Sequence, residues 1–390
     1  MMIYVNIIFV VKDIIYRDKS MKTIIDIINS NETKIDLSAM GEYDKCVFID
    51  IETTGLSADT SYIYEVGTAY LNEETGNYEI KQWLISQARE ERNMLYEVIA
   101  FLRGFKKLVH FNGNTFDIPF IQSRCKACGI ACDFSDYEGI DIYRRVSSLK
   151  HFLKLDNCKQ KSVENFIGID REDEYTGKDL IKVYRDYSEN LSEENEKLLL
   201  LHNHDDVLGL LKIVPVLSYN RIFNDGVVIK KVQTNVYNDV FGLSKKELIL
   251  TIGLPCEIPA PINYNAQGCY FSAKGCDGII KVPLLHEELK FFYTNYHDYY
   301  YLPEEDIAVH KSVAEYVDKD FREQAKASNC YTRKVSDYLP QWDKPIFEPF
   351  FRRDYDSSCI FFELTDSFKS SKESFNKYSN HILNMMYNCR

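Results

Sequence analysis

One apolar segment that ends in two acidic residues constrains the fold of this chain more than any other feature. The segment CVFIDIETTGL (46–56) predicts a buried strand, because apolar residues precede and separate Asp50 and Glu52. Residues two apart on a strand share a face, so both acidic side chains point the same way from the strand's end. A lone acidic pair usually lies on a solvated edge, but unpaired charges at the end of a buried strand are costly. A bound metal ion is the more economical explanation, and Mg²⁺ or Mn²⁺ prefers such hard oxygen ligands.

The segments that follow predict an ordered series of strands and helices. Residues 62–71 and 78–85 have the pattern of strands, and residues 90–104 carry apolar side chains at helical spacing. A short apolar strand over 107–111 leads through a glycine-containing loop into a helix over 117–128. Three strands followed by a helix, a strand and a helix form the opening topology of the ribonuclease H-like fold. We therefore expect an α/β fold in which a mixed sheet is flanked by helices.

The remaining sequence divides at a change of pattern near residue 221. Residues 142–190 look mainly helical, and a strongly patterned helix covers 193–211. Strand-like alternation begins after residue 221, and a helix is expected over 308–327. The predicted parts are an N-terminal extension with a helix from Met21 (1–36), a ribonuclease H-like domain (37–220) and a mixed α/β accessory domain of unknown role (221–390).

A third acidic residue opens the helix predicted after the short strand. Asp117 lies in FNGNTFDIPF (111–120), where a carboxylate can cap the helix and can also bind a metal ion. Asn112, five residues earlier, has two open interpretations. It either forms an Asx turn that shapes the loop or contacts a substrate.

The last acidic cluster lies on the helix over 193–211, in LLLHNHDDVLGL (199–210). His202 and Asp206 are four residues apart and therefore share a helix face. Asp205 is the rival to Asp206 if the helical phase differs by one residue. Leucines on both sides argue against a merely solvated polar patch.

With all three clusters in view, residues 45–215 resemble the DEDD 3′→5′ exonuclease superfamily of the ribonuclease H-like fold. Within it, the resemblance is to the YprB-type ribonuclease H-like proteins of bacteria. The segment DIETTGL (50–56) resembles the first exonuclease motif. Asn112-x-x-x-Phe116-Asp117-x-Pro119 is similar to the second motif, in the spacing of the proofreading domains of family B polymerases. His202-x-x-x-Asp206 lies where the third motif is expected.

The resemblance implies a metal-dependent nuclease that removes nucleotides from single-stranded ends of DNA or RNA. Water would attack the terminal phosphodiester, and two divalent ions, Mg²⁺ or Mn²⁺, would be the cofactors. A pair of such ions about 4 Å apart can hold both the attacking and the leaving oxygen of a phosphoryl displacement. The implied metal ligands are Asp50, Glu52, Asp117 and Asp206. The implied substrate contacts are Thr53, Leu56 and Asn112, with Leu56 as a wedge against the terminal base.

The third motif departs from both standard subtypes of the family. The tyrosine subtype has Tyr four residues before its last Asp, where this chain has His202. The histidine subtype has His five residues before, where this chain has Leu201. We expect His202 to be the general base, because an ordinary pKa of about 6.5 suits that task. Asp141, in the family-like segment GIDIYRR, is expected to cap a helix or end a strand.

Composition limits the partners and the compartment. The formal net charge of −12 argues against a protein that coats nucleic acid non-specifically, but it permits a locally basic groove. Eleven cysteines, an odd number without framework spacing, favour free thiols in a reducing cytoplasm. The apolar patch Ile3–Val11 is too short for a bilayer span, so no membrane partner is expected.

Other patterns admit a functional and an ordinary interpretation. Cys125, Cys128 and Cys132 lack the second ligand pair of a zinc site, and we expect free core thiols. Lysines between 150 and 182 form either a basic rim for nucleic acid or a solvated helix face. YTRK (331–334) and FFRR (350–353) offer either base-stacking aromatics or core.

Two rival classes of function remain open from the sequence. The first is a catalytically weakened nucleic-acid-binding module, which the His-for-Tyr difference in the third motif favours. The second is a structural or interaction protein, in which the four carboxylates are scattered caps and surface charges.

Overall fold

The computed structural model describes residues 21–28, 35–169 and 177–389. The chain divides into two units, Met1–Asn220 and Arg221–Arg390, and each is described by itself. The expected domain boundary near residue 220 lies beside this division, and the assignment of 1–36, 37–220 and 221–390 as separate parts stays a prediction. No helix in the described ranges is both long and apolar enough to cross a membrane. The apolar patch Ile3–Val11 lies outside the described residues.

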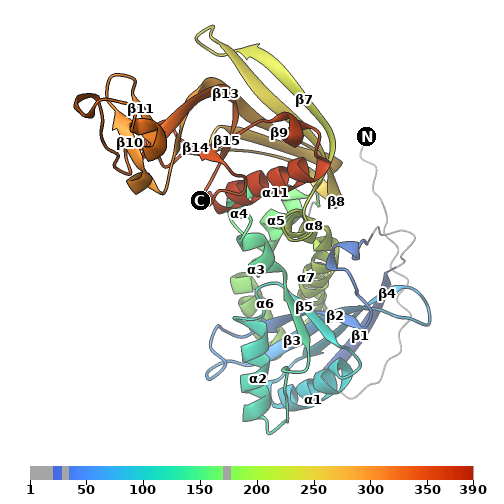
Figure 1. The fold of residues 1–390 in the computed structure, drawn as a ribbon. Coiled ribbons are helices and arrows are strands. Elements are labelled where there is room, and N and C mark those ends of the chain that lie inside the picture. The colour runs from blue at the N-terminus through green and yellow to red at the C-terminus, as the bar shows by residue number, and fades with distance from the viewer. Residues whose placement is uncertain (1–20, 29–34, 170–176, 390) are drawn as a thin grey trace, which may run out of the picture. The chain divides into compact units, whose positions relative to one another are not determined.

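A six-stranded mixed sheet forms the centre of the first unit (Figure 1). The strand order is β1-β4-β3-β2-β5-β6, and β2 pairs antiparallel with β3 and parallel with β5. β-Branched and other apolar residues dominate β2 and β3, as expected for strands that are covered on both faces. The strands are β1 (Met21–Ile28), β2 (Cys46–Thr53), β3 (Ile63–Leu71), β4 (Tyr78–Ile85), β5 (Lys107–His110) and β6 (Glu138–Asp141).

Helices cover this sheet and continue to the end of the unit. The expected helices near residues 90–104, 117–128 and 193–211 are all present, and further helices, the longest of 14 residues, lie in the described parts of 142–190. Ser192 caps the N-terminus of helix α7, because its side chain accepts a hydrogen bond from the backbone N–H of Asn195. The helices are α1 (Glu91–Leu102), α2 (Asp117–Ala127), α3 (Ile142–Ser147), α4 (Lys150–Leu153), α5 (Gln160–Phe166), α6 (Gly177–Asn190), α7 (Glu193–Lys212) and α8 (Ser218–Asn224).

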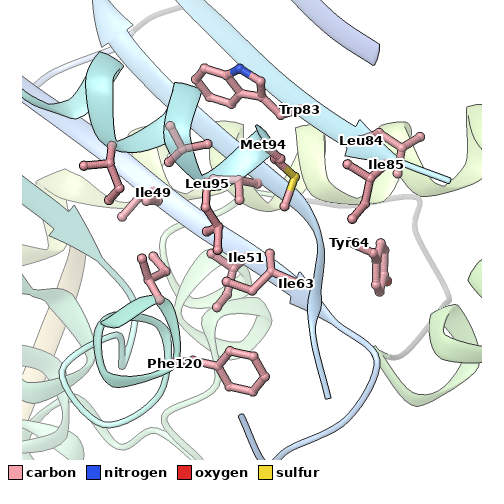
Figure 2. Close-up of a cluster of buried hydrophobic side chains, with 14 of the residues drawn as sticks. Ile49, Ile51, Ile63, Tyr64, Trp83, Leu84, Ile85, Met94, Leu95 and Phe120 are labelled. Carbon is pink, nitrogen blue, oxygen red and sulfur yellow. The ribbon is translucent and has the colours of Figure 1, made fainter. Parts of the chain in front are cut away.

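The two faces of β2 have different chemistry. Ile49 and Ile51 point into the apolar cluster that includes Met94 of α1 (Figure 2). Full burial of an Ile side chain contributes roughly 1.5–3 kcal/mol, so these contacts fix which face of the strand turns to α1. Because side chains alternate along a strand, Asp50 and Glu52 lie on the opposite face, where α7 packs.

The helix expected from Met21 is wrong, because residues 21–28 form the edge strand β1. This strand pairs antiparallel with β4, from Met21 opposite Ile85 to Ile28 opposite Tyr78. The apolar residues of this short segment fit a helical and a strand pattern equally well. The free edge of β4 decides between them. A paired strand satisfies the backbone N–H and C=O groups of that edge, whereas a helix at this place would leave them unpaired.

The second unit is built around a second six-stranded sheet, in the order β14-β15-β13-β9-β8-β7. Two long strands dominate it, β8 (Ser244–Ala266) and β9 (Cys269–Phe292), and a 17-residue helix, α11 (Lys372–Asn388), packs against β7 and β8. A three-stranded sheet, β11-β10-β12, completes the unit. The other elements are β7 (Val228–Asn238), β10 (Tyr299–Leu302), β11 (Ile307–His310), α9 (Lys311–Ala314), β12 (Glu323–Gln324), β13 (Tyr331–Gln341), β14 (Phe350–Phe351), β15 (Ile360–Glu363) and α10 (Asp366–Lys369).

The helix expected over 308–327 is also wrong apart from one turn, α9. The side chains of His310 and Asp318 accept hydrogen bonds from backbone groups two residues on, which starts a new local turn at each place. In the aromatic segments 331–334 and 350–353, Tyr331 and Phe351 are buried in the core. Base stacking by these two rings is therefore not favoured.

Candidate metal centre

Strand β2 carries the first two acidic residues to the sheet face that α7 covers. Tyr64 on β3 donates a hydrogen bond from its hydroxyl to Glu52 Oε2 (3.4 Å), and its ring stacks on Tyr184 at 4.0 Å. The register of β2 and β3 shifts between Glu52 and Thr53, so the strand ends just after the second acid. The Thr53 hydroxyl donates to the carbonyl oxygen of Gly55 (2.9 Å), which closes the turn.

Helix α7 brings the last acidic cluster against Glu52. His202 Nε2 lies 3.1 Å from Asp206 Oδ2 and 3.6 Å from Glu52 Oε1. One potential ligand atom from each of these three residues lies within 4.8 Å of the other two, which is the spacing of a metal site. His202 is 7% exposed, so this group is largely shielded from solvent.

Asn203, a residue that the sequence did not single out, ties the helix to Asp50. Its Nδ2 donates to Asp50 Oδ2 (3.1 Å), and its Oδ1 accepts from Nε2 of Gln82 (3.0 Å) on β4. The approach is close because β3 has a glycine at this point. A Cβ on Gly67 would lie 2.1 Å from Asn203 Oδ1 and 2.7 Å from the Val207 side chain. The available signal in the sequence was a polar residue directly after His202, in a helix whose leucines lie before and after the polar cluster.

Asp117 joins the group from the first turn of α2. Its side chain is 5% exposed, and it interacts electrostatically with Asp50 and Glu52. Burial raises the pKa of Asp117 to about 7, although backbone hydrogen bonds, including one from Ile51, lower it. Burial also raises the pKa of Glu52 to about 7 against the opposing charge of His202.

The pKa of Asp50 is raised as well. Burial raises the pKa of Asp50 well above its ordinary value, and the charges of Asp206, Glu52 and Asp117 raise it further. The hydrogen bond from Asn203 lowers it. Several buried carboxylates that repel one another are stable as anions only when cations compensate them, which is the electrostatic condition of a divalent-metal site.

The other acidic residue of the third cluster points elsewhere. Asp205 lies 3.4 Å from His204 Nδ1, and His204 Nε2 lies 3.0 Å from Asp26 of β1. Burial lowers the pKa of His204, but the hydrogen bonds to Asp205 and Asp26 outweigh it and raise that pKa to about 9. The helical phase therefore places Asp206, and not Asp205, beside Glu52.

Two of the three expected substrate contacts lie outside the carboxylate group. Leu56 is 88% exposed in the turn after β2, a position open to a ligand. Asn112 has a left-handed backbone, with φ of 64°, and its side chain accepts a hydrogen bond from the Thr115 hydroxyl (2.8 Å). Its backbone N–H donates to Asp141 Oδ1 (2.9 Å), and Asp141 also caps α3. The substrate roles of Thr53, Leu56 and Asn112 stay predictions.

The cysteines of α2 do not form a comparable group. Cys125 is buried, and Cys128 and Cys132 are half-buried free thiols. Among the described residues, the group with metal-ligand spacing is Glu52, His202 and Asp206. Gln160 of α5 donates a hydrogen bond to the backbone carbonyl of Asp206 (2.9 Å), which places α5 beside the site.

Comparison with known proteins assigns the fold of the first unit. Residues 47–218 match the model of the RNase_H superfamily, a range that runs from β2 to the start of α8. No curated protein matches the chain. The first unit therefore has a ribonuclease H-like fold, a mixed sheet flanked by helices, and a further sheet domain follows it.

Solved structures with similarity to the chain include a family B DNA polymerase from the archaeon Pyrobaculum calidifontis. It is 12% identical over 65% of this chain and 35% of that chain, with a TM-score of 0.34. Two E. coli exonuclease I structures, one with a single-stranded DNA and zinc and one with a dT13 oligonucleotide, have TM-scores of 0.28. They are 10% and 9% identical, each over 54% of this chain and 55% of that chain. The matches thus span about a third to half of those proteins, and at these TM-scores they carry no argument about this chain.

Proposed function

We propose that residues 37–220 form a metal-dependent nuclease, a 3′→5′ exonuclease that acts on single-stranded ends of nucleic acid. The observation that carries this proposal is the gathering of acidic side chains from β2, α2 and α7. Asp117 is buried, Asp50 and Glu52 are half-buried, and their negative charges repel one another. Asp206 lies beside Glu52 on α7. Such clustered carboxylates lower the stability of the fold unless cations neutralise their charge, which argues against a purely structural role.

The donor set fits Mg²⁺ or Mn²⁺. Asp50, Glu52, Asp117 and Asp206 would hold the ions, because hard divalent cations prefer carboxylate oxygens. Two ions held there would neutralise the charge of the phosphodiester and lower the pKa of an attacking water. Asn203 keeps Asp50 oriented through its 3.1 Å hydrogen bond, which is the role of outer partners at metal sites.

His202 is proposed as the group that takes the proton from the attacking water. Its imidazole lies in the carboxylate group, and a neighbouring negative charge stabilises the protonated form that results. The 3.1 Å distance to Asp206 and the 3.6 Å distance to Glu52 also suit a role as metal ligand. The two roles differ in one measurable respect, because a base is dispensable for metal binding and a ligand is not.

The exposed turn after β2 is proposed to contact the end of the strand. Leu56 would pack against the terminal base, since its side chain is almost fully open to solvent in the turn four residues after Glu52. Thr53 and Asn112 would contact the substrate from the turns that end β2 and β5.

A second candidate, a binding module with weakened catalysis, makes a different prediction for the same assay. The proposal is tested by digestion of DNA and RNA oligonucleotides, labelled at the 5′ or the 3′ end, with Mn²⁺. A 3′→5′ exonuclease produces a descending ladder from the 5′ label and releases the 3′ label as a mononucleotide. Asp206→Ala should abolish cleavage, whereas Asp205→Ala, an adjacent acid that faces His204, should retain it. Binding without cleavage by the unaltered protein favours the module.

A further inference from the structure

The second unit contains a groove whose lining is basic. It has a volume of about 590 Å³ and lies between the edge strand β7 and the segment that joins α10 to α11. Four lysines line it, two from β7 and two from the α10–α11 segment: Lys230, Lys231, Lys369 and Lys372. The floor is apolar and includes Leu248 and Phe375.

The charge of this groove is opposite in sign to the net charge of the whole chain. The chain has a formal net charge of −12, yet no carboxylate lines the groove among the described residues. Lys230 pairs with Asp277, and Lys369 lies 3.0 Å from Asp366. In the part of the chain that the structure describes, Lys231 and Lys372 form no ion pair, and both are exposed. Two cationic side chains are therefore available to an anionic ligand.

Hydrogen bonds between α11 and β7 build the groove before any ligand arrives. The backbone N–H of Ile229 donates to the side chain of Asn376 (2.6 Å), and that of Val227 donates to Asn380 (2.8 Å). The first turn of α11, at Lys372, lies at the rim, where the positive end of the helix dipole adds to the lysine charges. A preformed site loses less entropy when it binds a flexible strand.

We propose that this groove binds the phosphodiester backbone of single-stranded nucleic acid. The proposal rests on the proposed nuclease function, which identifies a nucleic-acid strand as the polyanion that the chain meets. Lysines supply the charge attraction to phosphates, and the apolar floor can contact sugars and bases. The second unit then increases affinity for the substrate without taking part in the chemistry.

The test uses the full chain with Ca²⁺ in place of Mn²⁺ and a fluorescein-labelled dT20 oligonucleotide, with binding followed by anisotropy across a salt series. Each phosphate contact to a single strand contributes about 0.7 to the slope of log K against log salt. The double variant Lys231→Gln/Lys372→Gln removes two such contacts and should therefore lower the slope by about 1.4. Relative to 1 M salt, this change of slope weakens binding about 25-fold at 0.1 M salt. The control, Lys319→Gln/Lys344→Gln, removes the same charge from exposed sites of the second unit outside the groove.

Each outcome is decisive for the groove. Equal losses in the two double variants would reveal a general effect of net charge and overturn the proposal, as would absence of oligonucleotide binding by the unaltered protein. Mn²⁺-dependent hydrolysis of a dinucleotide, whose single phosphodiester cannot occupy the groove and the carboxylate site at once, should be unchanged in the groove variant. Groove-dependent binding without any hydrolysis would reject the nuclease activity and leave the groove assignment standing.

Discussion

Substitution of Gly67 by alanine should damage both the stability of the first unit and its site. The added Cβ would lie 2.1 Å from Asn203 Oδ1, so Asn203 or the backbone must shift by about 1 Å to restore an ordinary contact. Asn203 cannot move freely, because Gln82 and Asp50 hold its two ends at 3.0 and 3.1 Å. Overpacking of this kind costs about 1–3 kcal/mol, and loss of a buried hydrogen bond to a charged group adds a similar amount. We expect a loss of about 2–6 kcal/mol in the free energy of unfolding.

Urea denaturation followed by tryptophan fluorescence measures this loss. The chain has two tryptophans, and a Trp342→Phe background leaves the buried Trp83 as a reporter of the first unit. Gly139→Ala is the matched control, because its Cβ would meet the nearest atom, Asn114 Oδ1, at 3.8 Å. The control should stay within about 0.5 kcal/mol of the parent. A similarly small change for Gly67→Ala, with unaltered hydrolysis, would refute the packing argument.

Three further predictions concern charge. The pKa of Glu52 is about 7 in the fold and 4.5 unfolded, so without metal the fold loses stability as pH rises from 4.5 to 7. In EDTA at pH 8, the free energy of unfolding of Glu52→Gln should therefore exceed that of the parent by up to about 3 kcal/mol. At pH 4.5 the two should differ little, and equal values at pH 8 would contradict this expectation. His202→Ala should slow hydrolysis at least about 100-fold while calorimetry finds Mn²⁺ affinity retained, and lost affinity would make His202 a ligand instead. Because Asp26 helps raise the pKa of His204 to about 9, Asp26→Asn should destabilise the fold by about 1–3 kcal/mol at pH 6 and less at pH 10; an equal effect at both pH values argues against the pair.

The pairs within β2 and within α7 were accessible to sequence reasoning because local geometry relates their members. Alternation along β2 places Asp50 and Glu52 on one face, and helical spacing places His202 beside Asp206. The strand and helix order of residues 45–215 was predictable for the same reason, since long periodic segments determine their own type.

The parts that sequence reasoning missed depend on partners distant in the chain. Asn203 acquires its role only because β3 has a glycine where α7 crosses it. Strand β1 was expected as a helix, because the sequence of residues 21–28 does not indicate that the edge of β4 is free to pair with them. In the second unit, residues 308–327 break into short turns at His310 and Asp318, where local side-chain hydrogen bonds outweigh helical spacing.

Calorimetric titration of Mn²⁺ into the metal-free protein at pH 7.5 is the most direct test of the central claim, that acids from three separate segments form one cation site. We expect two equivalents for the unaltered chain and for Asp205→Ala. Glu52→Gln/Asp206→Asn should bind fewer ions and at least about 10-fold more weakly. Equal binding by the double variant and the unaltered chain, or no binding by either, would contradict the account.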